Sequence, residues 1–360
     1  MDFALTLDYE LWGDGSGHIF KDVIEPTDKI LDICDLYNAK ITIFFEVVEY
    51  WRIKKEWESG NYMGYTSDPA AAMKMQIADA YRRGHDVQLH IHPQFINAKF
   101  EDGAWRTDDK WCMKDIPLNK NSSFDMNLKK VLSEGKRTLE DILKPVSSSY
   151  VCNIFRAGGF NILPSENIIK TLEELKFKAD SSVFAGGYEI SNLSNIDYRK
   201  IKNTIPYWSI KNNNVLIQEN NLLKESKMIE LPVYAFPIRR YKKYDLTRLK
   251  NVFRDKKSAF KTVHSKLDKK TILQKINFFL QEEYITCDYC LFNVTKMKKF
   301  LNLAQKTQKK IGYYPFCLIG HSKGYHSDKA LIFLLKSDKN INFITLTKVL
   351  EKIKRYQIEK

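Results

Sequence analysis

The sequence predicts an α/β protein whose strands form a parallel sheet or a barrel. Short apolar segments alternate with longer amphipathic segments along most of the 360 residues, and this alternation is typical of βα units. Polar side chains that suit catalysis follow several of the apolar segments. Because the carboxyl ends of parallel strands meet on one side of a sheet, we expect these side chains to form one site there.

In the first half of the chain, proline and glycine delimit the expected elements. Pro26 begins a helix, Gly84 ends another, and Pro145 stops a third, in keeping with the preferred positions of these residues. Residues 50–70 and 94–125 are expected to be irregular. The resulting elements are strands at 3–7, 40–48, 151–155 and ahead of Pro93, and helices from Pro26, at 70–83 and at 127–143.

The second half repeats the alternation more weakly. Ser165 is a favourable N-cap for a helix at 166–175, and residues 185–225 are expected to be rich in loops. The remaining elements are strands at 177–183, 228–236, 314–319 and 342–345, and helices near 269–283 and at 293–308, 327–336 and 347–357. Residues 1–360 are expected to form a single domain, with a basic insertion at 239–275.

His90 and His92 are the starting point for a functional site. Val87, Leu89 and Ile91 alternate with polar residues, so both histidines lie on one face of a strand that ends at Pro93. Two imidazoles at a strand end suit a divalent metal such as zinc. The alternative is a pair of polar residues at a strand tip, satisfied by water or backbone.

Other polar residues also follow expected strands. Asp8 and Glu10 share a face after the first strand, Arg156 and Asp180 follow two middle strands, and His321 follows a late one. Each also has a structural interpretation: Asp8 as a cap in a glycine-rich loop, Arg156 in a surface ion pair, and His321 and Asp180 in turns.

Composition and charge limit the classes of partner. The chain has 58 basic and 44 acidic residues, a net charge of +14, which favours acidic glycans, lipid-linked sugars or an anionic membrane, although scattered lysines are also typical of a solvated surface. No motif for nucleic acid accompanies the charge, so no nucleic-acid partner is expected. The start of the chain lacks the pattern of a signal peptide and the six cysteines lack framework spacing, so we expect a cytoplasmic protein, peripheral at the inner membrane if the basic insertion binds it.

Five short motifs in order resemble the polysaccharide deacetylase (NodB-homology) superfamily, in an atypical bacterial subgroup linked to surface polysaccharides. The motifs are Thr6-Leu7-Asp8-Tyr9-Glu10, Gly84-His85-Asp86-Val87-Gln88-Leu89-His90-Ile91-His92-Pro93, Arg156-Ala157-Gly158-Gly159, Asp180 in Asp-Ser-Ser, and Phe316-Cys317-Leu318-Ile319-Gly320-His321. Two departures stand out. The histidines lie two residues apart rather than four, with Gln94 at the usual second position, and Tyr9 replaces the second aspartate of the first motif.

The resemblance implies a distorted (β/α) barrel with fewer than eight strands. It also implies a metal-dependent hydrolase that removes an acyl group, such as acetyl, from an N-acylated amino sugar during synthesis of lipopolysaccharide, O-antigen or capsule. The substrate would be an N-acetylated sugar or a lipid-linked glycan, and the cofactor a divalent metal, expected to be Zn²⁺.

The resemblance further implies a role for each site residue. Asp8, His90 and His92 would bind the metal, and Glu10 would be the base, with Asp8 and Glu10 exchangeable in role. Arg156 would orient the base. His321 would protonate the departing amine, and Asp180 would orient the His321 imidazole. The main alternative is a catalytically inactive barrel that binds glycan.

Overall fold

The computed structural model describes residues 1–119, 126–219, 227–243 and 280–358. Among them, β1 (Asp2–Tyr9), β2 (Ile41–Glu46), β3 (Asp86–Ile91), β6 (Ile154–Ala157), β7 (Ala179–Asp180), β10 (Trp208–Ser209), β11 (Ile229–Glu230), β14 (Phe316–His321) and β15 (Asn342–Phe343) form one sheet. Its order is β10-β11-β7-β6-β3-β2-β1-β14, and β15 also pairs with β1. All these pairings are parallel except that of β10 with β11.

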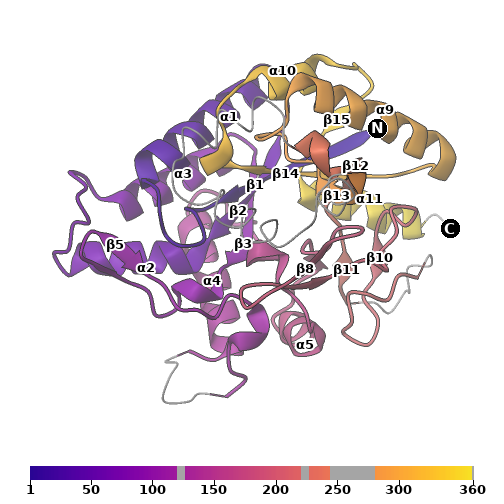
Figure 1. The fold of residues 1–360 in the computed structure, drawn as a ribbon. Helices are drawn as coiled ribbons and strands as arrows, with labels where there is room; N and C mark the ends of the chain where they lie inside the picture. The colour runs from indigo at the N-terminus through magenta and orange to yellow at the C-terminus, as the bar shows by residue number, and fades with distance from the viewer. Residues whose placement is uncertain (120–125, 220–226, 244–279, 359–360) are drawn as a thin grey trace.

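Val233 joins the two sides of this sheet. It pairs in parallel with Phe184, which follows β7, and also with Cys317 of β14. The backbone N–H of Val233 donates to the Val183 carbonyl, and that of Tyr234 donates to the Cys317 carbonyl, each at 2.8 Å. The sheet therefore curls into a distorted barrel, which confirms the predicted fold class (Figure 1), although the sheet has nine strands in the described residues where fewer than eight were expected.

Helices surround the strands and α11 packs against one end. The helices are α1 (Glu25–Leu36), α2 (Val47–Glu58), α3 (Pro69–Arg82), α4 (Leu128–Leu143), α5 (Glu166–Glu174), α9 (Val294–Ile311), α10 (Lys329–Lys336) and α11 (Leu346–Ile358). Residues of α11 contact Asp2, Thr42 and Asp86, which lie at the amino ends of their strands. The carboxyl ends of the strands thus lie at the opposite end of the barrel.

Two hydrophobic cores stabilise this arrangement, a small one inside the barrel and a larger one between the strands and the surrounding helices. Alternate strand residues such as Ala4, Phe44 and Ile154 face inward and pack with α11. Their neighbours, including Leu5 and Phe45, face outward into a core shared with the surrounding helices. Both faces of the strands are therefore covered by apolar side chains, as expected for a parallel sheet.

Several local predictions were wrong. Residues 47–58 form α2, where the end of a strand at 40–48 and the start of an irregular segment at 50–70 were expected, because Val47, Val48, Tyr50 and Ile53 bury one face of a helix. The segment expected to be irregular after Pro93 contains the hairpin β4 (Lys99–Glu101) and β5 (Ala104–Arg106). Ser165 occupies the N-cap position of α5 as predicted, but its hydroxyl makes no bond to the helix and donates to the Asn213 carbonyl instead.

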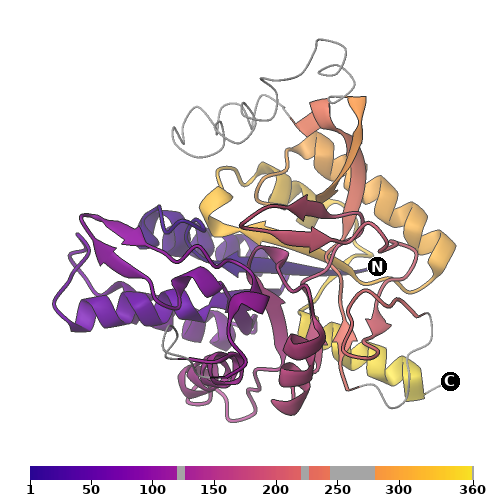
Figure 2. The same ribbon diagram turned by 60° about the horizontal axis from the view of Figure 1, so that its bottom comes forward.

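The later part of the chain adds two small two-stranded sheets. Within the region expected to be loop-rich, β8 (Tyr188–Ile190) pairs with β9 (Asn195–Asp197). A second ribbon, β12 (Ala235–Arg239) with β13 (Glu282–Thr286), extends from the barrel (Figure 2). β13 begins inside the helix expected near 269–283; residues 269–279 of that helix and most of the basic stretch 239–275 lie outside the described residues. None of the helices in the described part of the chain has the length and apolarity needed to span a membrane.

Candidate functional site

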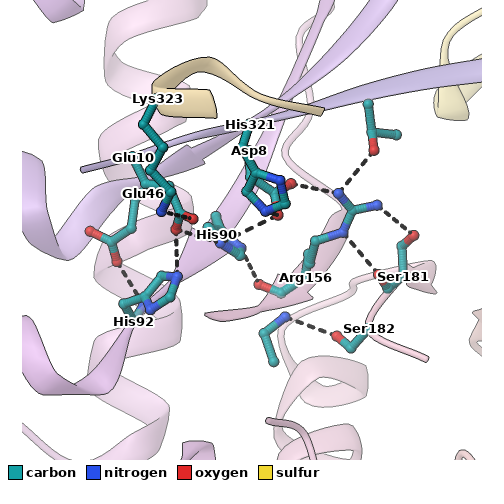
Figure 3. Close-up of polar contacts among 12 residues, drawn as sticks. Asp8, Glu10, Glu46, His90, His92, Arg156, Ser181, Ser182, His321 and Lys323 are labelled. Atoms are coloured by element: carbon teal, nitrogen blue, oxygen red, sulfur yellow. Dashed lines mark hydrogen bonds and ion pairs between the residues drawn. The ribbon is translucent and has the colours of Figure 1, made fainter. Parts of the chain in front are cut away.

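Strand register brings the predicted site residues to the carboxyl end of the barrel. Asp8 of β1 is the partner of His321 in β14, and His90 of β3 is the partner of Arg156 in β6. Partners in parallel strands point to the same face of the sheet. The four side chains therefore point into the barrel together, as Figure 3 shows, while Glu10 and His92 follow directly after their strands.

Arg156 fixes the position of Asp8. The fully buried guanidinium donates from Nη1 to Asp8 Oδ1 at 2.5 Å and to Thr6 Oγ1 at 2.9 Å. It also donates to the carbonyl and hydroxyl of Ser181, and its centre lies 4.0 Å from the centroid of the Phe44 ring. A guanidinium held on all sides gives the Asp8 carboxylate a single defined orientation.

The second oxygen of Asp8 remains directed into the site. Its Oδ2 atom lies 3.9 Å from His90 Nε2 and 3.7 Å from His321 Nε2. Both separations exceed normal hydrogen-bond length. Asp8 thus presents one fixed carboxylate oxygen between two imidazoles.

Glu10 lies beside both histidines of the His-x-His motif. Its Oε2 atom is 3.2 Å from His90 Nε2 and 2.5 Å from His92 Nε2, while Lys323 Nζ donates to Oε1 at 2.7 Å. Burial raises the pKa of Glu10, but His92, Lys323 and His90 outweigh this effect and hold it well below its usual range. Glu10 is therefore an anion in this site.

The two histidine rings are oriented by neighbours. The Nδ1 atom of His90 lies 2.9 Å from the Arg156 carbonyl; because a carbonyl only accepts, Nδ1 carries a proton, and Nε2 is the ring atom that faces Glu10 and would bind a metal. The Nδ1 atom of His92 lies 2.9 Å from the side-chain amide of Gln94. Burial lowers the pKa of His92, and the Glu10 carboxylate opposes this effect.

Gln94 leaves one buried atom without a partner beside His92. Its Nε2 atom donates to the Gly13 carbonyl at 3.1 Å and lies against His92 Nδ1, whereas its Oε1 atom is buried without a hydrogen-bond partner among the described residues. The Nε2 atom of His92 has the Glu10 carboxylate at 2.5 Å. Metal binding through His92 Nε2 would place the ring proton on Nδ1, and a rotation of the Gln94 amide, at the expense of its bond to Gly13, would let Oε1 accept that proton.

These residues fit a divalent metal by donor set and by charge. One ligand atom from each of Glu10, His90 and His92 lies within 4.8 Å of the other two, and the same holds for Asp8, Glu10 and His321. Two imidazoles with one carboxylate are a common donor set for zinc. The first set differs from the predicted Asp8, His90 and His92 because Arg156 holds Asp8 while Glu10 contacts both rings.

Two further buried carboxyl groups lie beside Glu10. Glu46 accepts the backbone N–H of His92 at 2.7 Å, and Glu49 accepts that of Leu11 at 3.0 Å. Burial, together with the neighbouring carboxylates, raises the pKa of Glu46 well above its usual range and that of Glu49 to about 8. Both groups therefore favour the protonated form, and a divalent cation close by would favour their ionisation.

His321 is paired with Asp288. Its Nδ1 atom lies 2.7 Å from Asp288 Oδ2, and the side chain is 25% exposed. Burial lowers the pKa of His321, but the charge and hydrogen bond of Asp288 and the charge of Asp8 raise it overall. The other oxygen of Asp288 accepts backbone N–H groups of Cys290 and Leu291. His321 is thus a partly accessible imidazole that holds its proton more firmly than a free histidine does.

Asp180 does not contact His321, contrary to the sequence-based expectation. It is the register partner of Phe155 and Glu230, and Phe155 belongs to the outer core. Asp180 therefore faces away from the barrel interior, where it accepts hydrogen bonds from Ser182 and interacts with Glu230. Ser181, the next residue, faces the site instead.

Sequence reasoning missed Asp288, Lys323 and Glu46. Asp288 lies between two cysteines in a segment that pairs with Ile319 of β14, and nothing in its local pattern indicated this pairing. Lys323 had a weak signal, since it lies two residues after His321. Glu46 lies at the carboxyl end of β2, as Asp8 and Arg156 do in their strands. The same search for polar residues at strand ends could therefore have found it.

The comparisons with known proteins found structures but no sequence relatives. No protein-family model and no curated protein matches the chain. A candidate polysaccharide deacetylase from Mycobacterium smegmatis aligns with a TM-score of 0.48 and 11% identity over 99% of this chain and 91% of that one. A 4-alpha-glucanotransferase from Thermococcus litoralis aligns with a TM-score of 0.47 and 9% identity over 98% of this chain and 40% of that one. The Puue allantoinase aligns with a TM-score of 0.46 and 11% identity over 97% of this chain and 88% of that one.

Proposed function

We propose that this chain is a metal-dependent hydrolase of the polysaccharide deacetylase type, which removes an acyl group from an N-acylated amino sugar. The observation that carries the proposal is the division of the site into two parts. Glu10, His90 and His92 form a donor set on one side, and the His321–Asp288 pair lies on the other, with the Arg156-bound Asp8 between them.

Each part has a chemical task in amide hydrolysis. A divalent metal, expected to be Zn²⁺, would be held by Glu10, His90 and His92 and would acidify water and polarise the amide carbonyl. The Oδ2 oxygen of Asp8 would take the proton of the attacking water. His321 would give a proton to the departing amine, and Asp288 would keep its imidazole charged and oriented.

Asp8 and Glu10 exchange the roles of ligand and base that the sequence had predicted for them. Arg156 donates to Asp8, so Asp8 is the carboxylate that Arg156 orients and is the better base. Glu10 contacts both histidines, so it is the better ligand. Surface-polysaccharide synthesis, a lipid-linked glycan substrate and binding of the basic stretch to acidic membranes extend the same proposal.

The first test measures bound metal and acetate release together. We expect about one zinc ion per purified wild-type chain by elemental analysis, and zinc-dependent release of acetate from N-acetylglucosamine oligomers. His90→Ala/His92→Ala should lose both, because two of three ligands are removed. The control is Asp180→Asn, which alters a buried acid on the outer face of the barrel and should keep both.

The alternative of an inactive glycan-binding barrel gives a different result. Binding of the oligomers without stoichiometric metal or acetate release would favour that alternative. Stoichiometric zinc in the double alanine variant would contradict the assigned ligands.

A further inference from the structure

Lys323 lies inside the site rather than on the surface. It belongs to the short 3-10 turn Ser322–Gly324 after β14, and its side chain is only 9% exposed. Its ammonium donates to Glu10 Oε1 at 2.7 Å and to the Leu11 carbonyl at 2.6 Å, and it lies 5.3 Å from the centroid of the Trp12 ring. Three consecutive residues after β1 therefore hold a desolvated cation.

Because of this contact, the two oxygens of Glu10 have different partners. Oε1 accepts from Lys323, whereas Oε2 faces His90 and His92 (Figure 3). A carboxylate with one oxygen held by an ammonium can offer only the other to a metal. The same ammonium places a positive charge next to the donor set, where it repels a second cation.

We propose that Lys323 is a positioning residue that restricts Glu10 to one-oxygen metal binding and weakens the affinity of the site for a divalent cation. The inference rests on the proposed metal site. A carboxylate that shares its charge with an ammonium donates less electron density to a metal. Lys323 would thus keep the bound ion a stronger Lewis acid, at the expense of affinity.

The test compares zinc affinity in metal-free full-length proteins by titration against a chromophoric chelator. Lys323→Met keeps the length and apolar stem of the side chain but removes the charge, so we expect zinc to bind at least tenfold more tightly than in the wild type. Lys323→Arg keeps the charge and serves as the matched control, with an affinity within about threefold of the wild type. Equal or weaker binding in Lys323→Met would overturn the inference.

A second neutral variant guards against a failure to fold. Lys323→Gln can still donate a hydrogen bond to Glu10, and it should also bind zinc more tightly if charge is the cause. Circular dichroism of the metal-free proteins checks their folding. If neither neutral variant folds, Lys323 is only a structural counter-charge for Glu10, and the inference is overturned.

The outcomes separate this inference from the proposed function. A wild-type protein that binds no zinc contradicts the proposed metal site itself. A wild-type protein that binds zinc, with neutral variants of unchanged affinity, contradicts only the role of Lys323.

Discussion

At the scale of single residues, each ionised group of the site has a defined counter-charge. Asp8 is paired with Arg156, Glu10 with Lys323, and Asp288 with His321. Buried ions need such partners, because an unpaired charge in the interior costs several kcal/mol. The pairing also determines which atoms are available to a substrate, since it leaves one oxygen of Asp8 and the Nε2 atom of His321 directed into the site.

The His321–Asp288 pair yields a prediction about pH. The carboxylate of Asp288 raises the pKa of His321, so the imidazole keeps its proton, and its ability to act as an acid, to higher pH. In Asp288→Asn this charge is lost and the pKa falls. The alkaline limb of the kcat/KM profile for acetate release should therefore move to lower pH, by about one unit.

Asp180→Asn is the matched control for Asp288→Asn. It removes the carboxylate that the sequence had predicted as the partner of His321, but Asp180 faces the outer side of the barrel. Its alkaline limb should coincide with that of the wild type. A shift in Asp180→Asn and none in Asp288→Asn would reverse the two assignments.

At the scale of elements, the short strands β7 and β11 carry a pair of buried acids that lies outside the site. Asp180 and Glu230 are register partners without exposed surface. Burial raises the pKa of Glu230 well above its usual range, with Asp180 adding to the shift, and burial also raises the pKa of Asp180. The pair therefore favours a shared proton, with Glu230 as the protonated member.

This pair predicts how stability depends on pH. A carboxyl whose folded pKa is raised contributes stability that is complete below the unfolded pKa, about 4.3 for glutamate, and is lost as pH rises toward the folded value. Glu230→Gln mimics the protonated acid: its carbonyl can accept the Val183 N–H that Glu230 Oε1 accepts, and its amide can donate to Asp180. Its free energy of unfolding should exceed that of the wild type increasingly as pH rises from 5 to 8.

Urea denaturation at several pH values measures this difference. The control is Glu174→Gln, a change of an exposed acid paired with Lys129, which should have little effect because solvent and salt screen exposed ion pairs. A difference between Glu230→Gln and wild type that stays constant with pH would contradict the assigned protonation.

At the scale of the whole molecule, Val233 closes the barrel. Its backbone is hydrogen-bonded toward Val183, and its neighbour Tyr234 is hydrogen-bonded toward Cys317. This closure brings β14, with His321 and the adjoining Lys323, to the same barrel end as His90 and His92. The functional site therefore depends on a contact between segments far apart in the sequence.

Val233→Pro tests the closure. Proline removes the N–H that donates to the Val183 carbonyl, and leaving that buried acceptor unpaired should cost about 1–3 kcal/mol. Hydrogen exchange should show faster exchange of the backbone amides of β7 and β14 than of β2 and β3. Val233→Ala keeps the backbone hydrogen bonds of Val233, so any faster exchange that it causes should not be concentrated in β7 and β14. Uniform exchange in Val233→Pro would show that the closure is not a weak point of the barrel.

The sequence by itself determined the repeating strands and helices, and most of the residues that gather at the barrel end. Within one strand the side chains alternate, so His90 and Asp8 could be placed at strand ends from local pattern alone. The α/β barrel also followed from local pattern and from the resemblance of the motifs. These features depend on residues close together in the chain, which is why the sequence carries them.

Only the tertiary structure decided which partner each charged group has. Asp180 lies in a two-residue strand, too short for alternation to predict the face of its side chain, and the register with β6 turns it outward. Asp288 and Lys323 reach the site from loops beside β14, and Arg156 selects Asp8 across a separation of 148 residues. Such pairings are set by strand register and loop path, which are properties of the closed barrel and not of any local stretch of sequence.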